Sequence, residues 1–155
     1  MNHRILWVED EATGDLADYV GPLLLAGYTV DIAESATEAI SKLQEQTYDV
    51  VIFDLVINAG DAPEWMALDQ ENTERFKELN LGFQLLQSLF APENARICVS
   101  LPPGRIAVSR TAVFTVVADP EVHRALEQMG IATIRVKALS SLTVLKQIVE
   151  ELIPQ

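Results

Sequence analysis

The 155-residue sequence has a single cysteine, few basic residues and no apolar stretch long enough to span a membrane. A membrane-spanning helix needs roughly 20 consecutive apolar residues, so we expect no transmembrane segment. The formal net charge of −12 argues against nonspecific binding to nucleic acid and against anionic membranes, because both need a basic protein surface. The opening MNHRILWVEDE reaches carboxylates too early for a signal peptide, and we therefore expect a cytoplasmic protein.

The lone cysteine, Cys98, cannot form a disulfide within the chain, and its apolar neighbours predict a buried side chain rather than a reactive thiol. His3 and His123 stand alone, without further metal ligands at useful spacing. Neither a P-loop nor a GxGxxG fingerprint is present, which argues against a nucleotide-binding enzyme.

Short apolar runs alternate along the chain with segments of helical character. We expect strands at Arg4–Val8, Tyr28–Ala33, Val50–Phe53, Ala112–Val117 and Ile134–Val136, and helices at Thr13–Ala26, Ser35–Gln46, Glu121–Met129 and Ser141–Leu152. Such alternation implies a parallel sheet with right-handed crossovers. We therefore predict one α/β domain over residues 1–155, a doubly wound five-stranded parallel sheet.

Local signals set several helix ends. Gly27 is expected to end the first helix, and Pro22 to kink it. Ser35 and Glu38 fit a capping box at the start of the second helix.

Two segments between the third and fourth strands exceed what a minimal five-strand sheet needs. Residues 59–80 are acidic, and a helix is expected over Pro63–Leu79. Residues 95–110 predict an extra strand, a Pro-Pro-Gly turn and a return segment. Connections this long usually have structure or function of their own, so the acidic insertion is interpreted as a solvated helical face, with partner docking as the alternative.

Chemically capable side chains follow the predicted strands. Glu9, Asp10, Asp54, Thr115 and Lys137 each lie at or just after a strand end. In open parallel sheets, functional groups collect at the carboxyl ends of the strands. Clustered carboxylates repel one another and favour Mg²⁺, beside which a carboxylate can act as a nucleophile toward a phosphoryl group.

Four motifs resemble the receiver domain of bacterial response regulators. They are Ile5–Glu11 (ILWVEDE), Tyr48–Asp54 (YDVVIFD), Val113–Thr115 (VFT) and Ile134–Lys137 (IRVK). The interval from Asp10 to Asp54 is 54 − 10 = 44 residues, and that from Thr115 to Lys137 is 137 − 115 = 22, both usual in that family. The glycine seven residues before the lysine is also present. The resemblance covers nearly the whole chain outside the two insertions and implies the flavodoxin-like receiver fold.

The resemblance also implies roles for individual residues. Asp54 would accept a phosphoryl group from a sensor histidine kinase or a phosphotransfer protein, and Lys137 and Thr115 would bond to its oxygens. The implied Mg²⁺ ligands are Glu9, Asp10, Asp54 and the backbone carbonyl of Val56. The domain would then be no enzyme beyond Mg²⁺-dependent phosphorylation and dephosphorylation of its own aspartate. As a stand-alone receiver, it would signal to a downstream protein by direct contact. A homodimer is a further possibility.

Several positions depart from the family pattern. Val116 replaces a small residue and would narrow access to Asp54, while Ile134 replaces the aromatic that usually moves with the threonine. Ala138 replaces a proline, and Asn58 stands where a proline is common. These departures motivate an alternative, a pseudo-receiver that binds partners without regulation by phosphate.

Two further alternatives concern single positions. A phosphatase of the haloacid-dehalogenase type needs a second aspartate two residues after the nucleophile, where this chain has Val56. Ser100 competes with Thr115 for the switch hydroxyl because Arg96–Ser100 also resembles a fourth strand, but the ungapped spacing to Lys137 favours Thr115.

Overall fold

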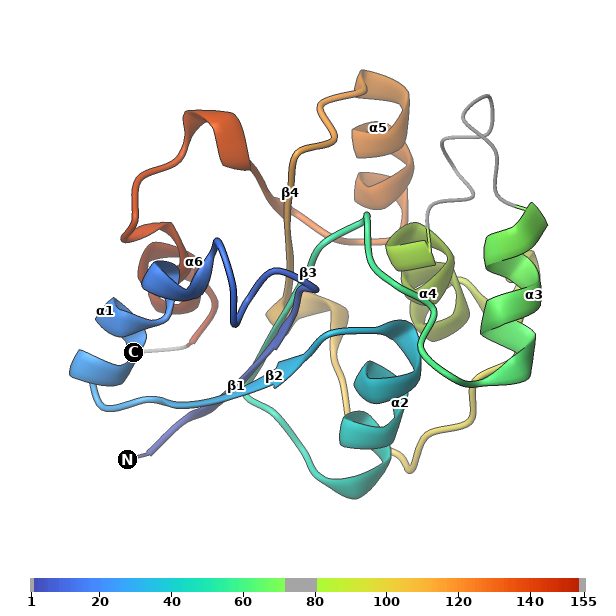
Figure 1. The fold of residues 1–155 in the computed structure, drawn as a ribbon, viewed down its shortest axis with the longest axis horizontal. Helices are drawn as coiled ribbons and strands as arrows, with labels where there is room; N and C mark the ends of the chain where they lie inside the picture. The colour runs from blue at the N-terminus through green and yellow to red at the C-terminus, as the bar shows by residue number, and fades with distance from the viewer. Residues whose placement is uncertain (1, 72–80, 154–155) are drawn as a thin grey trace.

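The computed structural model describes residues 2–71 and 81–153, and a parallel sheet lies at its centre (Figure 1). The five strands are β1 (Arg4–Val8), β2 (Thr29–Ala33), β3 (Val50–Phe53), β4 (Thr111–Thr115) and β5 (Thr133–Val136). Their order across the sheet is β2-β1-β3-β4-β5, and each neighbouring pair is parallel. The predicted doubly wound α/β sheet is confirmed.

Helices cover both faces of the sheet. They are α1 (Gly21–Leu25), α2 (Ala36–Glu45), α3 (Pro63–Glu71), α4 (Leu81–Phe90), α5 (Pro120–Gln128) and α6 (Val144–Leu152). Figure 1 shows α1 and α6 on one side, and α2, α4 and α5 on the other with α3 beside α4. None of the helices in the described residues is long and apolar enough to cross a membrane.

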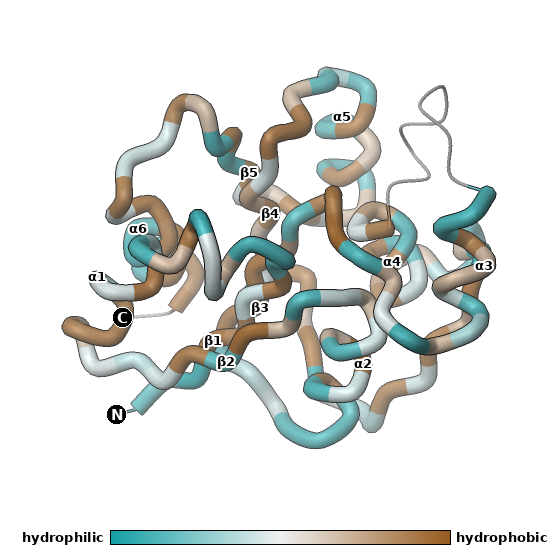
Figure 2. The backbone as a smooth tube through the Cα atoms, in the orientation of Figure 1, coloured by the Kyte–Doolittle hydropathy of each residue, from teal (hydrophilic) through white to brown (hydrophobic). Residues whose placement is uncertain are grey.

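Two apolar clusters hold these layers together, one on each face. Trp7, Leu23 and Ile148 belong to the cluster beneath α1 and α6. Leu43 and Leu126 belong to the larger cluster beneath α2, α4 and α5. Figure 2 shows the hydrophobic positions gathered along the central strands, as expected when a parallel sheet is covered on both faces.

The region after β1 corrects the sequence prediction. Only Gly21–Leu25 of the expected helix Thr13–Ala26 is α-helical, preceded by a 3₁₀ turn at Ala17–Tyr19. Pro22 does not kink a longer helix but lies in the first turn of α1, where its missing N–H costs no hydrogen bond. Gly27, with φ of 90°, follows the short helix as expected.

The start of α2 follows its predicted capping signal in part. Oγ of Ser35 accepts a 3.1 Å hydrogen bond from the backbone N–H of Glu38. The carboxylate of Glu38 accepts from the N–H of Glu34 at 2.6 Å, one residue before the expected partner. The cap therefore satisfies two backbone donors, as a capping box does. The second donor is the N–H of Glu34 rather than that of Ser35.

The first insertion contributes a helix packed on the core. Its predicted helix Pro63–Leu79 is confirmed over Pro63–Glu71, and residues 72–79 lie outside the described residues. Trp65 and Leu68 are buried in the larger apolar cluster. Those two side chains anchor α3 to the domain.

The second insertion contains no strand, contrary to the prediction for residues 95–110. Its Ile97, Val99 and Leu101 pack partly buried against the core, whereas Cys98 between them is exposed. The alternation is strand-like, but no neighbouring strand pairs with it among the described residues. The prediction that Cys98 is buried is therefore wrong. Its side chain points away from the core, on the side opposite to those of Ile97 and Val99.

Candidate functional site

Three carboxylates meet at the carboxyl edge of the sheet. Glu9 and Asp10 follow β1, and Asp54 follows the adjacent β3, whose Phe53 is in register with Val8. One carboxylate oxygen from each lies within 4.8 Å of the others. Glu9 and Asp54 are buried and Asp10 is half-buried. The predicted cluster is thus formed by neighbouring strand ends.

Lys137, which follows β5, reaches into this cluster. Its Nζ donates to Oδ2 of Asp54 at 2.9 Å and forms a second, short hydrogen bond to Oε1 of Glu9. The same Nζ lies 5.7 Å from the centre of the Phe114 ring. Only 12% of the lysine side chain is exposed, so its charge acts where water screens little.

The backbone holds the second oxygen of Asp54. Oδ1 accepts hydrogen bonds from the N–H groups of Leu55 at 2.7 Å and Val56 at 3.3 Å. The N–H of Val56, the residue whose carbonyl was predicted as a metal ligand, therefore lies against the Asp54 carboxylate. These bonds fix the orientation of Asp54 before any ligand binds.

The charges of the cluster are unbalanced, with three carboxylates against one ammonium. Burial, and next the nearby Asp54 carboxylate, raise the pKa of Glu9 to about 7. Burial lowers the pKa of Lys137, but its hydrogen bonds to Glu9 and Asp54 outweigh this effect and raise it overall. An added cation would relieve the remaining repulsion, and carboxylate oxygens suit Mg²⁺.

Thr115 lies where the sequence placed it, at the end of β4, and is fully buried. Its Oγ1 accepts from the N–H of Val117 at 3.3 Å, and among the described contacts it makes no bond to the acidic cluster. Ser100 is exposed and lies outside any strand. The strand assignment therefore favours Thr115 over Ser100, because Thr115 ends β4, the neighbour of β3 in the sheet.

The positions that depart from the family pattern lie in different surroundings. The side chain of Val116 is 61% exposed, and Ala138 is also exposed. Ile134 is partly buried and packs against the larger apolar cluster. Asn58 accepts a 2.9 Å backbone hydrogen bond from Ala36, which ties the loop after Asp54 to the start of α2.

Sequence reasoning missed one positioning residue, Gly82. Its N–H donates to the carbonyl of Leu55 at 2.9 Å, and a Cβ at Gly82 would lie 2.1 Å from the carbonyl oxygen of Asp54. Only a glycine lets α4 approach the acceptor loop this closely. A glycine inside an apolar helical run was the available signal.

Comparisons with known proteins identify the fold. No protein-family model matches the chain, and no curated protein matches it either. A CheY-like response regulator receiver domain protein from Methanospirillum hungatei JF-1 is 22% identical, with a TM-score of 0.62 over 98% of this chain and 94% of that one. The receiver domain of a putative LuxO repressor from Vibrio parahaemolyticus is 17% identical, with a TM-score of 0.64 over 99% and 91%.

A third similar structure has a magnesium ion coordinated in its active site cleft. It is the receiver domain of a sensor histidine kinase from Pseudomonas aeruginosa PAO1, 16% identical, with a TM-score of 0.59 over 99% of this chain and 98% of that one. The chain therefore has the fold of response-regulator receiver domains. The two insertions enter this fold between β3 and β4.

Proposed function

We propose that this chain is a phosphoacceptor receiver of a two-component phosphorelay, in which a histidine kinase or phosphotransfer protein phosphorylates Asp54. One observation carries the proposal. Lys137 bonds directly to Asp54 and Glu9, inside a three-carboxylate cluster at the functional edge of a receiver fold. A structural ion pair alone would not need two further carboxylates against the same pair.

In the proposed transfer, each group of the site has its own part. An oxygen of the Asp54 carboxylate attacks phosphorus, an O–P bond forms, and the P–N bond of phosphohistidine breaks with its electron pair leaving on the imidazole nitrogen. The backbone bonds to Oδ1 hold the carboxylate in place, while Oδ2 bonds, among the residues that the structure describes, to Lys137 alone. Oδ2 is thus the oxygen that a shift of the lysine frees for attack.

Lys137 then exchanges partners. Its ammonium leaves Oδ2 of Asp54 for the oxygens of the incoming phosphoryl group, whose charge it stabilises. The second bond of Lys137, to Glu9, keeps the side chain at the site during this exchange. Thr115, one strand away, supplies the hydroxyl that would turn toward the phosphoryl group.

The residues present fit a magnesium ion. Glu9, Asp10, Asp54 and the carbonyl of Val56 would hold it, and it would neutralise charge on the transferred phosphoryl oxygens. The geometric support for this fit is the cluster itself, since one carboxylate oxygen from each of Glu9, Asp10 and Asp54 lies within 4.8 Å of the others. The magnesium-containing Pseudomonas receiver domain supports the same choice of ion.

Signalling would follow by protein–protein contact. The alternative is a pseudo-receiver that binds partners irrespective of phosphate, and Ile134 in place of an aromatic favours it. The two functions differ in one measurable property, which is whether a phosphodonor modifies Asp54.

The test uses a small phosphodonor, acetyl phosphate, with and without Mg²⁺, and intact-protein mass spectrometry. Wild-type protein should gain one phosphoryl group only with Mg²⁺, and Asp54→Asn should gain none. Asp61→Asn, an exposed aspartate in the loop that follows, is the matched control and should behave as wild type. Equal modification of wild type and Asp54→Asn, or none of wild type, would contradict the proposal.

Metal binding has a separate test. Trp7 is buried two residues before Glu9, and Trp65→Phe leaves it as the single tryptophan. Titrating this variant with Mg²⁺ should change Trp7 fluorescence with saturation, and Asp10→Asn should weaken the response. A fluorescence change that persists unweakened in Asp10→Asn would remove the carboxylate cluster as its origin.

A further inference from the structure

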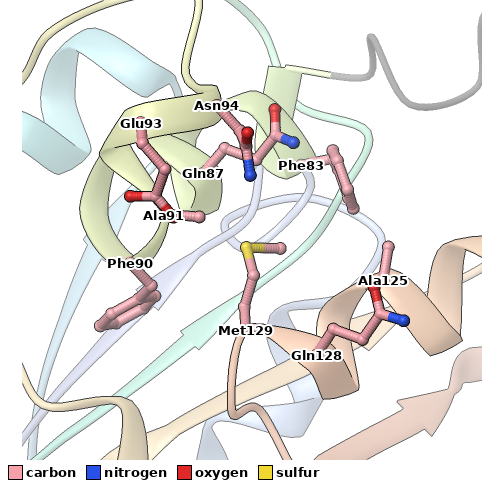
Figure 3. A pocket seen from close by; sticks show the side chains of 9 residues that line it. All are labelled: Phe83, Gln87, Phe90, Ala91, Glu93, Asn94, Ala125, Gln128 and Met129. Carbon is pink, nitrogen blue, oxygen red and sulfur yellow. The ribbon is translucent and has the colours of Figure 1, made fainter.

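A cavity of about 230 Å³ lies between α4 and α5, and its lining includes none of the acidic cluster Glu9, Asp10 and Asp54 (Figure 3). It is lined by Phe83 near the start of α4, by the last turns of α4 and α5, and by the residues that follow them, including Met129. α4 begins against the carbonyl of Leu55, beside the acceptor aspartate, and runs for ten residues away from it. Its far end is therefore roughly 15 Å from that loop.

The cavity has a mixed lining that suits one particular kind of side chain. Gln87, Asn94 and Gln128 contribute amide groups, and Glu93 contributes a carboxylate. Figure 3 shows Met129 extending between the two helices toward Gln87 and Asn94, with the Phe90 ring to its lower left. An occupant with an apolar stem and a polar, hydrogen-bonding head would match both parts of this lining.

The electrostatics at this end of the helices favour a cation. Helix carboxyl ends carry partial negative charge and carbonyls without intrahelical partners, and here α4 and α5 both end at one cavity. Neither helix has a basic residue in its last turn. Glu93 is the charged residue in the described lining, and its carboxylate adds negative charge to that of the helix ends.

We propose that this cavity receives an arginine side chain from a partner protein. The guanidinium would donate to Glu93 and to the amide oxygens of Gln87 or Asn94, while its stem packs against Met129 and its plane against Phe90. The volume is below the roughly 300–1,000 Å³ typical of small-molecule pockets, and therefore suits a single side chain. The net charge of −12 favours a partner whose contacting segment is basic.

The position of the cavity separates partner docking from phosphoryl transfer. The acceptor site lies at the carboxyl ends of the strands, whereas the helices between strands end at the opposite edge of the sheet. A partner held by this cavity would leave the Asp54 edge open. Docking through the arginine and phosphorylation of Asp54 could therefore occur on the same molecule at the same time.

The experiment compares two probes of nearly equal shape, N-acetyl-arginine amide and N-acetyl-citrulline amide, by backbone amide chemical shifts of the labelled protein. The arginine probe should shift the amides of Gln87, Asn94 and Met129 with saturation, and the neutral citrulline probe should not. Glu93→Gln should weaken the arginine response by roughly 3- to 5-fold, the effect of one partly exposed charge pair.

Glu121→Gln is the matched control, because it removes the same charge from an exposed position in the first turn of α5. It should leave the arginine response unchanged. Shifts spread equally over the acidic surface, an equal response to citrulline, equal weakening by both variants, or no saturable response would each overturn the proposal. None of these outcomes depends on whether Asp54 is phosphorylated.

Discussion

Nζ of Lys137 lies 2.9 Å from Oδ2 of Asp54, although a complete strand, β4, separates the strands that these residues follow. Two strand spacings amount to roughly 9–10 Å, which a long, flexible side chain can cross and a short one cannot. The arrangement therefore requires a long basic side chain at this edge of the sheet. It also means that one ammonium compensates carboxylates from two other strands.

Removing that ammonium should destabilise the protein. Lys137→Met leaves Glu9 and Asp54 buried with no cation beside them, and we expect the free energy of unfolding to fall by about 3 kcal/mol in metal-free buffer. Urea unfolding followed by circular dichroism measures the change.

The control for this variant is Lys146→Met. Lys146 pairs with Glu150 at 3.7 Å on an exposed face of α6, where both side chains are at least two-fifths exposed. Its loss should cost less than about 1 kcal/mol. A similar fall in the free energy of unfolding for both variants would show that burial does not strengthen the interaction of Lys137 with Glu9 and Asp54.

Gly82→Ala should disturb the acceptor loop. The added Cβ would lie 2.1 Å from the Asp54 carbonyl oxygen and 2.5 Å from Cα of Leu55, and backbone cannot rotate away as a side chain can. We expect a loss of about 3 kcal/mol, at the upper end for overpacking, together with slower phosphorylation of Asp54. Thermal unfolding and the acetyl phosphate assay measure the two effects.

Gly21→Ala provides the comparison, because nothing lies within 4 Å of a Cβ at that position in α1. Its stability should stay within about 1 kcal/mol of wild type. A Gly82→Ala protein as stable and as readily phosphorylated as Gly21→Ala would disprove the close approach of α4.

Alkaline pH should weaken the fold through Tyr48. Burial, and next the hydrogen bond from its hydroxyl to Asp31 at 2.7 Å, raise the pKa of Tyr48 above its ordinary value of 10.0. The folded protein then keeps a proton that the unfolded chain loses, so stability is full below pH 10.0 and falls as pH rises above it.

Tyr48→Phe lacks this proton and should lose less stability than wild type over the same alkaline range. Urea midpoints of the two proteins, measured at a series of pH values, give the comparison. Parallel pH profiles for the two proteins would show that Tyr48 titrates alike in the folded and unfolded chains.

Cys98 should react in the native protein. Its side chain is exposed on the segment between α4 and β4, so a maleimide reagent should label it at a rate near that of the protein unfolded in urea. Labelling is followed by intact mass, with Cys98→Ser as the blank. Protection of the native thiol by an order of magnitude or more would show that this segment buries it after all.

The strands could be predicted because their signal is local. The bounds of Arg4–Val8 and Val50–Phe53 agree with the structure, since continuous apolar runs ending in carboxylates leave little choice of register. Local sequence signals gave wrong predictions in two other segments. The expected helix Thr13–Ala26 is α-helical only from Gly21 to Leu25, and the alternation after α4 has no paired strand among the described residues.

The sequence by itself determined which residue types stand at the strand ends. That placement predicted one site formed by Glu9, Asp10, Asp54, Thr115 and Lys137. Only the tertiary structure decided how they are joined. The order β2-β1-β3-β4-β5 places Glu9 beside Asp54 and puts β4 between Asp54 and Lys137. Distances across a sheet depend on which strands are neighbours, and side-chain contacts and burial follow from packing that no single segment encodes. For the same reason Gly82 and the cavity between α4 and α5 emerged only from the fold.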